Sequence, residues 1–414
     1  MQSTPSQRIE IIDSLRGFAL AGIVICHFVE NYIGAPAPAS FNEAVHPGMV
    51  DNIIDGLIYF FLRGKFIALF SFLFGLSFFI QMDNGAKRGT NFAPRFLWRL
   101  FILLLIGYVH SLFYRGDILT IYAILGVLLV PFYKMESKYI LAFSALLFLG
   151  LGRYVVFYLT KGDSIWGGPV EFGPEAAGVS EYYDILKNGS IGDVFRTNAV
   201  DGHQMKLEFQ FGFFGRGYFT FAFFLIGLYI GRSAYFKKFR EEKRFTKRVL
   251  IGSIVTFVIA TVLTALAFMS LGENMAFDNW TAMLGLTAMD VANTALTFIY
   301  IALFIMLYRK AKPEKWLSKL APYGMMALTN YVAQSLIGTW LLFGWGLGLI
   351  GELRVLYTFG IGLLIIILQV WTSQWWLQRF KYGPLEWMWR SITFFRVFPM
   401  AKEPIAKNIH PPSE

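Results

Sequence analysis

The chain has 414 residues, of which 56% are hydrophobic and only 15% are charged. This composition excludes a soluble globular chain, which is nearer a quarter charged, and a disordered chain, which is poorer in apolar residues. The net charge is +10, and the single cysteine, Cys26, excludes a disulfide framework within the chain, a cysteine-rich zinc site and Fe–S ligation.

Ten apolar runs long enough to cross a membrane follow one another along the chain. They lie at 15–33, 52–81, 96–114, 117–133, 139–160, 211–231, 249–271, 282–308, 320–343 and 355–378. Because Arg63-Gly64-Lys65 interrupts the overlong second run, that run predicts a short helix followed by a spanning one. We therefore expect an all-α, polytopic integral membrane protein with about ten transmembrane helices.

The connections between the runs alternate in charge, and cytoplasmic connections are enriched in Lys and Arg. Segments 34–51 and 272–281 contain neither residue type, whereas 232–248 contains eight basic residues and 309–319 contains five. With ten spans, this alternation places both termini in the cytoplasm. The positive charge thus marks the cytoplasmic face, and we expect no nucleic-acid partner.

The chain divides into three expected regions. An N-terminal transmembrane region, 1–210, includes an external loop at 161–208 with eight acidic and four basic residues. Its Gly, Pro and Tyr content indicates an ordered cap or a substrate-facing loop. A C-terminal transmembrane region covers 211–398, and 399–414 form a cytoplasmic tail. The basic, Trp-rich stretch after Arg379 is expected to lie along the inner membrane interface.

Polar residues on one face of the first run are candidates for a functional site, because ionisable side chains inside a membrane are costly. The residues that follow one another at steps of three or four are Asp13, Arg16, Leu20, Ile23, His27 and Asn31. Arg16 and His27 are eleven residues apart, or about 16 Å of helix rise, and lie on nearly the same face. Alternatively, Asp13 and Arg16 form an interfacial ion pair and His27 is a packed polar residue.

The third run repeats this spacing, because Arg99 and His110 are also eleven residues apart. The turn Tyr114-Arg115-Gly116-Asp117 then places a carboxylate within reach of His110. A His–carboxylate pair suits general-base work, since the carboxylate fixes the tautomer and stabilises the imidazolium. Alternatively, Asp117 caps the N-terminus of the next helix and His110 satisfies a buried carbonyl group.

Three polar residues elsewhere admit two interpretations each. Lys65 reaches a phosphate or carboxylate, or its ammonium group extends to the membrane interface. Asn330 and Gln334 share a face of the ninth run, where they bind substrate or form hydrogen bonds between helices.

Five motifs occur together in the chain. They are Asp13-Ser14-Leu15-Arg16-Gly17-Phe18-Ala19-Leu20, Lys65-Phe66 before LFSFLFG, His110 with Gly116-Asp117-Ile118-Leu119, Met326-Ala327-Leu328-Thr329-Asn330-Tyr331 with Gln334-Ser335, and Gly383-Pro384-Leu385-Glu386-Trp387 with Trp389-Arg390. In this combination the chain resembles the YeiB-like bacterial membrane proteins over nearly its whole length. Residues from about 211 to 395 look like a domain without an assigned function.

The resemblance implies membrane acyl transfer. YeiB-like proteins are grouped with transmembrane acyltransferases, among them heparan-α-glucosaminide N-acetyltransferase and bacterial enzymes that O-acylate surface polysaccharides. In the O-acyltransferases an arginine and a histidine lie eleven residues apart on the first span, as Arg16 and His27 do. YeiB-like proteins more usually have asparagine at the position of His27. This departure brings the chain closer to the O-acyltransferases, or it is an incidental polar substitution.

We therefore expect an acyltransferase of the bacterial inner membrane, where membrane lipids surround it. It would move an acyl group, expected to be acetyl, from cytoplasmic acyl-CoA to an extracytoplasmic hydroxyl or amine acceptor. No metal is expected. His27 or His110 would be the general base, with Asp117 orienting His110. Arg16, held by Asp13, would bind the thioester oxygen or the pantetheine entry. The residues expected to bind the CoA phosphates are Arg95, Arg99, Lys65, Lys87 and Arg88, and those expected to meet the acceptor are Asn31, Asn330 and Gln334.

Two alternatives compete with this expectation. A transporter or flippase for a small solute or lipid would use the same buried Arg, His and Asp residues. A non-catalytic membrane scaffold or sensor would tolerate replacement of both histidines.

Overall fold

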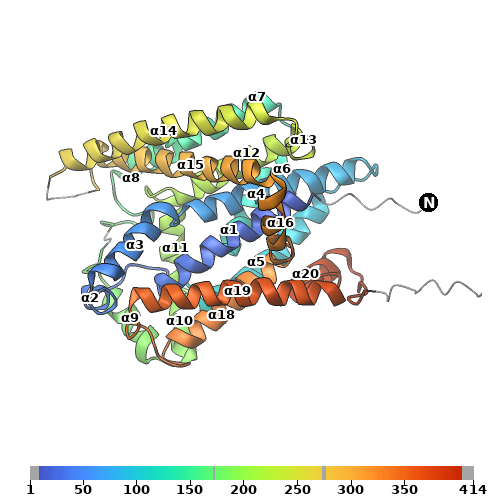
Figure 1. The fold of residues 1–414 in the computed structure, drawn as a ribbon. Coiled ribbons are helices and arrows are strands. Elements are labelled where there is room, and N and C mark those ends of the chain that lie inside the picture. Colours follow the sequence, from blue (N-terminus) through green and yellow to red (C-terminus); the bar gives the residue numbers. More distant parts are fainter. Residues whose placement is uncertain (1–8, 171–172, 273–276, 403–414) are drawn as a thin grey trace, which may run out of the picture.

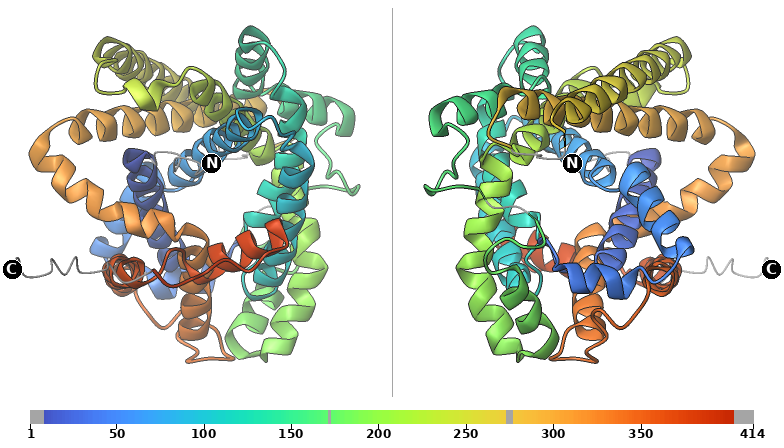
Figure 2. Two further views of the ribbon diagram at one scale, coloured as in Figure 1. Left: turned by 90° about the vertical axis from the view of Figure 1, so that its right-hand side faces the viewer. Right: turned by 90° about the vertical axis from the view of Figure 1, so that its left-hand side faces the viewer.

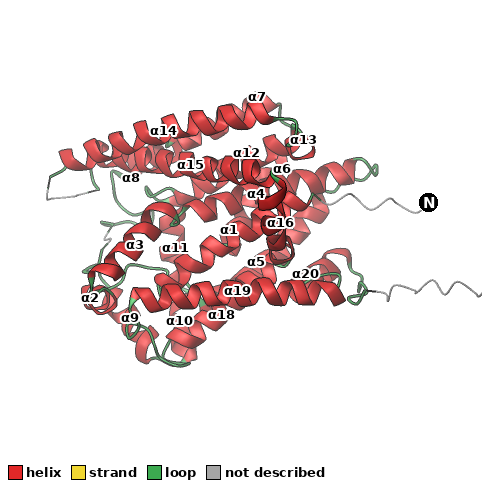
Figure 3. Cartoon of the chain, viewed as in Figure 1, coloured by secondary structure: helices red, strands yellow, loops and turns green. Residues whose placement is uncertain are grey.

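The computed structural model describes residues 9–170, 173–272 and 277–402. Within these ranges the regular structure is helical throughout, without strands and with two isolated β-bridges (Figure 3). This confirms the all-α class expected from the sequence.

Every apolar run forms helix. The helices that occupy the runs are α1 (Glu10–Val29), α3 (Met49–Phe61), α4 (Lys65–Ala86), α5 (Ala93–Phe113), α6 (Leu119–Phe132), α7 (Ser137–Phe148), α8 (Leu151–Thr160), α12 (Arg216–Arg232), α14 (Lys243–Ser270), α15 (Trp280–Tyr308), α17 (Ala321–Met325), α18 (Ala327–Leu342) and α19 (Val355–Arg379). The break predicted at Arg63-Gly64-Lys65 separates α3 from α4.

The chain is a multi-pass membrane protein. In the described ranges, α1, α3 with α4, α5, α14, α15 and α19 give six segments long and apolar enough to cross a membrane. Two bent pairs, α7 with α8 at 52° and α11 (Asp201–Phe211) with α12 at 62°, raise this number to eight. Helices α6 and α18 have 14 and 16 residues, which is shorter than the 18 or more residues of each of the six spanning segments. The count of ten therefore stays a prediction that depends on these two short helices.

Short helices cover the two ends of the bundle (Figures 1 and 2). At the left of Figure 1 lie α2 (Ala39–Val45), α9 (Val179–Asn188) and α10 (Ile191–Ala199), and at the right lie α13 (Tyr235–Lys238), α16 (Ala311–Leu317) and α20 (Pro384–Phe394). The 3-10 turn η1 (Ser318–Leu320) follows α16. The right-hand end thus carries the basic connections 232–248 and 309–319 together, as the charge alternation predicts. The cytoplasmic location of that end remains an expectation.

The segment 161–208 is ordered by its own helices wherever the structure describes it. It contains α9, α10 and most of α11. Helix α10 begins at a capping box, in which the side chains of Ser190 and Asp193 each accept a hydrogen bond from the other residue's backbone amide. α10 packs against α5, so this segment lies over the end of the bundle where α5 turns into α6.

Helices α4 and α12 are parallel neighbours in the core. Gly64 lies beside Arg216, Gly75 beside Phe224, and Phe79 beside Gly231, so the two helices advance in the same direction. A Cβ atom at Gly75 would lie 2.0 Å from the carbonyl oxygen of Phe224. Only glycine allows this approach, which brings the N-termini of α4 and α12 together at one end of the bundle.

Candidate active site

A cavity of ≈ 670 Å³ lies between the helices. Its wall is formed by α1, the α3–α4 break, the α5–α6 turn, the start of α12 and the middle of α15, together with residues of the 161–208 segment. Both the N-terminal and the C-terminal regions therefore contribute to the cavity.

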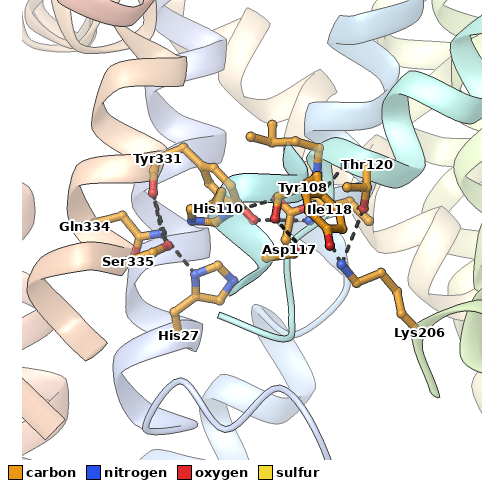
Figure 4. Close-up of polar contacts among 12 residues, drawn as sticks. His27, Tyr108, His110, Asp117, Ile118, Thr120, Lys206, Tyr331, Gln334 and Ser335 are labelled. Carbon is orange, nitrogen blue, oxygen red and sulfur yellow. Dashed lines mark hydrogen bonds and ion pairs between the residues drawn. The ribbon is translucent and has the colours of Figure 1, made fainter. Parts of the chain in front are cut away.

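His27 of α1 and His110 of α5 lie against the same two tyrosine rings, those of Tyr114 and Tyr331, and Figure 4 shows both histidines with Tyr331. The ring centroid of Tyr114 is 4.9 Å from that of His27 and 6.2 Å from that of His110. The centroid of Tyr331 is 6.0 Å from His27 and 5.1 Å from His110. Both histidines are buried, and His27 lines the cavity whereas His110 lies outside its lining. The first and third apolar runs thus do bring their histidines to one place.

Asp117 holds His110 and caps a helix at the same time. His110 Nδ1 lies 2.8 Å from Asp117 Oδ1, and both side chains are about 98% or more buried. The same carboxylate accepts hydrogen bonds from the backbone amides of Leu119 (3.1 Å) and Thr120 (3.0 Å) and from the Thr120 hydroxyl. Asp117 thus contacts His110 and also caps α6, whereas no carbonyl group within the described residues accepts a hydrogen bond from His110. The general-base role of the pair stays a prediction.

The hydrogen bonds leave one histidine with a free acceptor nitrogen and the other with a free donor nitrogen. His110 donates Nδ1–H to the carboxylate, so its Nε2 has the lone pair, and this buried atom has no hydrogen-bond partner in the described residues. The Tyr32 hydroxyl donates to Gln334 Oε1, which turns Gln334 Nε2 toward His27 Nδ1 at 3.2 Å. Neutral His27 therefore has its proton on Nε2. One ring offers an acceptor and the other offers a donor.

Lys206 of α11 connects the 161–208 segment to this pair. Its Nζ atom lies 3.8 Å from Asp117 Oδ2 and 3.4 Å from the Thr120 hydroxyl (Figure 4). The lysine is buried and lines the cavity. It supplies a positive charge that compensates the buried carboxylate.

The Asp13–Arg16 pair lies away from the cavity. Arg16 Nη1 is 2.7 Å from Asp13 Oδ1, and Arg16 Nη2 donates to Ser77 Oγ of α4 at 3.0 Å. Neither residue is part of the cavity lining. The ion pair proposed as the structural alternative is therefore present.

Of the basic residues expected to bind CoA phosphates, Arg95 and Arg99 contact α20, whereas Lys65 lies at the α3–α4 break. The guanidinium of Arg99 stacks on the Trp389 ring at 3.7 Å, and that of Arg95 lies 5.0 Å from the Phe394 ring centroid. Arg88 is exposed and donates to the Asn84 carbonyl. Arg99 thus holds α20 against α5, whereas Arg95 and Arg88 remain accessible from outside the bundle.

Three other predicted site residues make structural contacts. Lys65 is buried and donates to the Tyr59 carbonyl at the end of α3, which neither interpretation anticipated. Asn31 follows α1 with φ +50° and donates to the Val29 carbonyl. Asn330 donates to Ser373 Oγ of α19, as the interhelical interpretation predicts. Of the residues expected to meet the acceptor, Gln334 is the one that contacts a histidine.

A buried ion triad was not predicted from the sequence. The Arg153 side chain is 1% exposed and forms an ion pair with Asp290, whose other oxygen lies 2.6 Å from Arg216 Nη1. Arg153 also donates to the carbonyl oxygens of Phe213 and Phe214 and to the Thr287 hydroxyl. The available signal was the one used for the first run, an ionisable residue within an apolar run, because Arg153 lies in 139–160 and Asp290 in 282–308.

Helix α20 fixes the start of α18. Glu386 accepts hydrogen bonds from the backbone amides of Leu328 (2.7 Å) and Thr329 (3.1 Å). Burial raises the pKa of Glu386, although the hydrogen bonds from Thr329 and Leu328 act in the opposite direction. The contact positions the first turn of α18, and Tyr331 and Gln334 follow within the next turn and a half.

No group of three or more His, Cys, Asp or Glu side chains that could hold a metal ion occurs within 9–170, 173–272 and 277–402.

Comparison with known proteins gives two family matches. Residues 8–186 match the model described as "Heparan-alpha-glucosaminide N-acetyltransferase, catalytic", and residues 230–396 match "Protein of unknown function (DUF418)". The first half of the chain is therefore similar to a transmembrane acyltransferase.

Full-length relatives agree with these matches. The chain is 29% identical to "Uncharacterized protein YxaH" of Bacillus subtilis (strain 168), with 96% of this chain and 97% of the relative covered. It is 27% identical to "Uncharacterized protein YeiB" of Escherichia coli (strain K12), with 94% and 96% covered. The resemblance to the YeiB-like proteins and to the transmembrane acyltransferases is thereby confirmed.

Proposed function

We propose that this chain is an acyl-CoA-dependent acyltransferase of the bacterial cytoplasmic membrane. It moves an acyl group, expected to be acetyl, to the hydroxyl or amine of an acceptor held in the cavity. The observation that carries the proposal is the pair of histidines with opposite hydrogen-bonding capacities beside the cavity, in the half of the chain that matches the acyltransferase model.

In this proposal His110 is the general base. The acceptor oxygen or nitrogen attacks the thioester carbonyl carbon, a C–O or C–N bond forms, and the C–S bond breaks. The acceptor proton passes to His110 Nε2 and then to the departing CoA thiolate, while Asp117 stabilises the transient imidazolium through Nδ1–H. Because His110 is not exposed in the cavity, the wall beside Tyr331 must open when the acceptor binds.

His27 acts as the electrophilic partner. Its Nε2–H, set by the hydrogen bond from Gln334 to Nδ1, donates to the thioester oxygen as negative charge develops there. A fixed donor in a buried site stabilises this charge more than water would, because the dipole is already oriented. His27 lines the cavity, where the thioester must arrive.

The donor enters from the end of the bundle that carries α20. Arg95, Arg88 and Lys87 supply exposed positive charge there for the CoA phosphates. Arg16 and His27 are separated by about 16 Å along the axis of α1. In the proposal the pantetheine arm covers this distance, so that the thioester reaches His27. In the proposal Arg16 keeps its ion pair with Asp13 and contacts the arm with its remaining N–H groups.

Binding and turnover test the proposal separately. Purified protein should bind acetyl-CoA saturably, and the Arg88→Ala/Arg95→Ala double variant should bind it more weakly. Membranes containing the protein should release CoA thiol from acetyl-CoA only when acceptor is present, and His110→Ala should abolish this release while leaving acetyl-CoA binding intact. The proposal is wrong if folded protein binds no acyl-CoA, or if His27→Ala and His110→Ala both retain full transfer.

The second candidate function is transport, and the broken helices favour it. The α3–α4 break and the 62° α11–α12 break meet at the cavity, where a Cβ atom at Gly64 would lie 2.7 Å from Arg216 Nη2. Discontinuous helices that meet at a binding site are typical of transporters. Uptake of solute into proteoliposomes without acyl-CoA, unaffected by His110→Ala, would favour this candidate over acyl transfer.

A further inference from the structure

The N-termini of two parallel helices converge on one part of the cavity wall. α4 begins at Lys65 and α12 at Arg216, and their N-cap residues, Gly64 (φ +81°) and Gly215 (φ +68°), are left-handed glycines without a side-chain cap. The first amides of each helix therefore have no side-chain acceptor. Two aligned helix N-termini favour a negative charge at this point.

The side chains at this point carry a net positive charge. Arg153 and Arg216 share the single carboxylate of Asp290, so the triad has one positive charge in excess. All five N–H groups of a guanidinium are donors, and among the described residues Arg216 uses only Nη1, toward Asp290. Its side chain is 29% exposed and lines the cavity.

The other acidic side chains of the cavity have partners elsewhere. Arg63 Nε lies 2.7 Å from Glu30 Oε1, and Arg63 Nη2 lies 3.7 Å from Asp55 Oδ1. Glu208 Oε2 accepts hydrogen bonds from the Ser164 hydroxyl and the Ile165 amide, while Glu208 Oε1 has no hydrogen-bond partner in the described residues. None of these carboxylates contacts Arg216, so the excess charge beside Asp290 has no counter-ion within the described chain.

Neutral polar side chains line the same cavity as this cation. Asp290, Asn293 and Thr294 share one face of α15, and all three line the cavity. Gln210 lines the same cavity, is 93% buried, and its Oε1 atom has no hydrogen-bond partner in the described residues. An unpaired buried acceptor costs free energy unless a ligand donates to it.

We propose that this part of the cavity is an anion subsite, where Arg216 and the N-termini of α4 and α12 bind the phosphate or carboxylate of a ligand that also has hydroxyl groups. The hydroxyls would donate to Gln210 and bond with Asn293 and Thr294. The acceptor is thus an anionic sugar or polyol, or a hydroxylated lipid headgroup. Identifying this ligand as the acceptor rests on the proposed acyl transfer, whereas the subsite itself does not.

Equilibrium dialysis with radiolabelled glucose 6-phosphate and glucose tests the subsite in purified full-length protein. Glucose 6-phosphate should bind saturably and be displaced by inorganic phosphate, and glucose should bind at least about tenfold more weakly, because a hydrogen bond to a charged group is at stake. Arg216→Gln should weaken glucose 6-phosphate binding at least about tenfold, whereas Arg216→Lys should keep most of it. Arg196→Gln, the same change at an 85% exposed side chain of α10, should have no effect.

The proposal is overturned if wild-type protein binds neither inorganic phosphate nor glucose 6-phosphate. It is also overturned if Arg216→Gln, shown by circular dichroism to be folded, binds as wild type does, or if Arg196→Gln weakens binding equally. Nanodiscs of phosphatidylcholine with and without phosphatidylglycerol distinguish the two ligand sources, because an anionic headgroup that occupies the subsite would weaken glucose 6-phosphate binding. Anion binding without acyl transfer would retain the subsite and reject the acyltransferase.

Discussion

The Asp117→Asn substitution distinguishes the two roles of this carboxylate, which are to orient His110 and to accept hydrogen bonds from the start of α6. Asp117 accepts hydrogen bonds from His110 at 2.8 Å, from the Leu119 amide at 3.1 Å and from the amide and hydroxyl of Thr120 at 3.0 Å. Asparagine keeps the shape but has one acceptor oxygen. If that oxygen faces α6, the new NH₂ group faces His110 Nδ1. Because NH₂ is a hydrogen-bond donor, it favours the His110 tautomer in which Nδ1 has the lone pair and Nε2 has the proton.

A base whose lone pair faces the wrong way cannot take the acceptor proton. The corresponding change in a serine protease triad lowers kcat about 10⁴-fold, and general-base catalysis contributes about 10²–10⁴-fold. We therefore expect Asp117→Asn to lower acyl transfer by about 10²–10⁴-fold. The NH₂ group that replaces Oδ1 also faces the Leu119 amide, and the loss of that hydrogen bond should lower the free energy of unfolding by about 1 kcal/mol.

Thr120→Val is the matched control. It removes the hydroxyl hydrogen bond to Asp117 at the same end of α6, at a cost of about 1 kcal/mol, and leaves the His110–Asp117 hydrogen bond in place. Thermal unfolding in detergent measures the stability of each variant, and CoA release per folded molecule measures the rate. If Asp117→Asn loses no more activity per folded molecule than Thr120→Val, the carboxylate is only a cap and the reasoning is refuted.

Three further predictions follow from the geometry. His110→Ala should lower transfer about 10²–10⁴-fold and His27→Ala by less, since His27 donates a hydrogen bond without accepting the proton; equal effects in the CoA-release assay would contradict these roles. Asp290→Asn leaves the buried Arg153 and the partly exposed Arg216 without a carboxylate and should cost about 3–5 kcal/mol of unfolding free energy, whereas Glu136→Gln in an exposed ion pair should leave the melting temperature unchanged. Because the pKa of Glu386 is raised, the folded chain retains a proton that the unfolded chain releases near pH 4.3, so stability should fall as the pH rises above about 4.3 through the folded pKa. Glu386→Gln should abolish this slope in melting curves, and an unchanged slope would assign it to another group.

The parts of the site predictable from the sequence are those that depend on local chain geometry. His110 and Asp117 are seven residues apart across a tight turn, so their contact follows from the end of one helix and the start of the next. The all-helical fold followed from the apolar runs, and the break at Gly64 from the charges on either side of it. The alternation in charge between successive connections predicted that 232–248 and 309–319 lie at the same end of the bundle, and α13 and α16, which belong to them, do lie there.

Contacts between distant segments could not be predicted in this way. Arg99 is a cation near the end of an apolar run, as a phosphate ligand would be, but it stacks on Trp389, 290 residues further along the chain. Asn330 and Gln334 share a helix face, yet Asn330 contacts α19 and Gln334 contacts His27, because different helices cover successive turns. The Arg153–Asp290 pair required the packing of α8 against α15, which a single sequence does not specify.

Acetyl transfer across sealed, inside-out membrane vesicles would demonstrate the proposed activity itself. Labelled acetyl-CoA is supplied on the outside, which is the cytoplasmic face, and labelled product is measured in the lumen together with free CoA in the medium. If acyl transfer crosses the membrane, label should accumulate in the lumen in amounts equal to the CoA released, and this accumulation should be abolished by His110→Ala and retained by Thr120→Val. Wild-type vesicles that release no CoA and accumulate no label, or a His110→Ala variant as active as wild type, would contradict it.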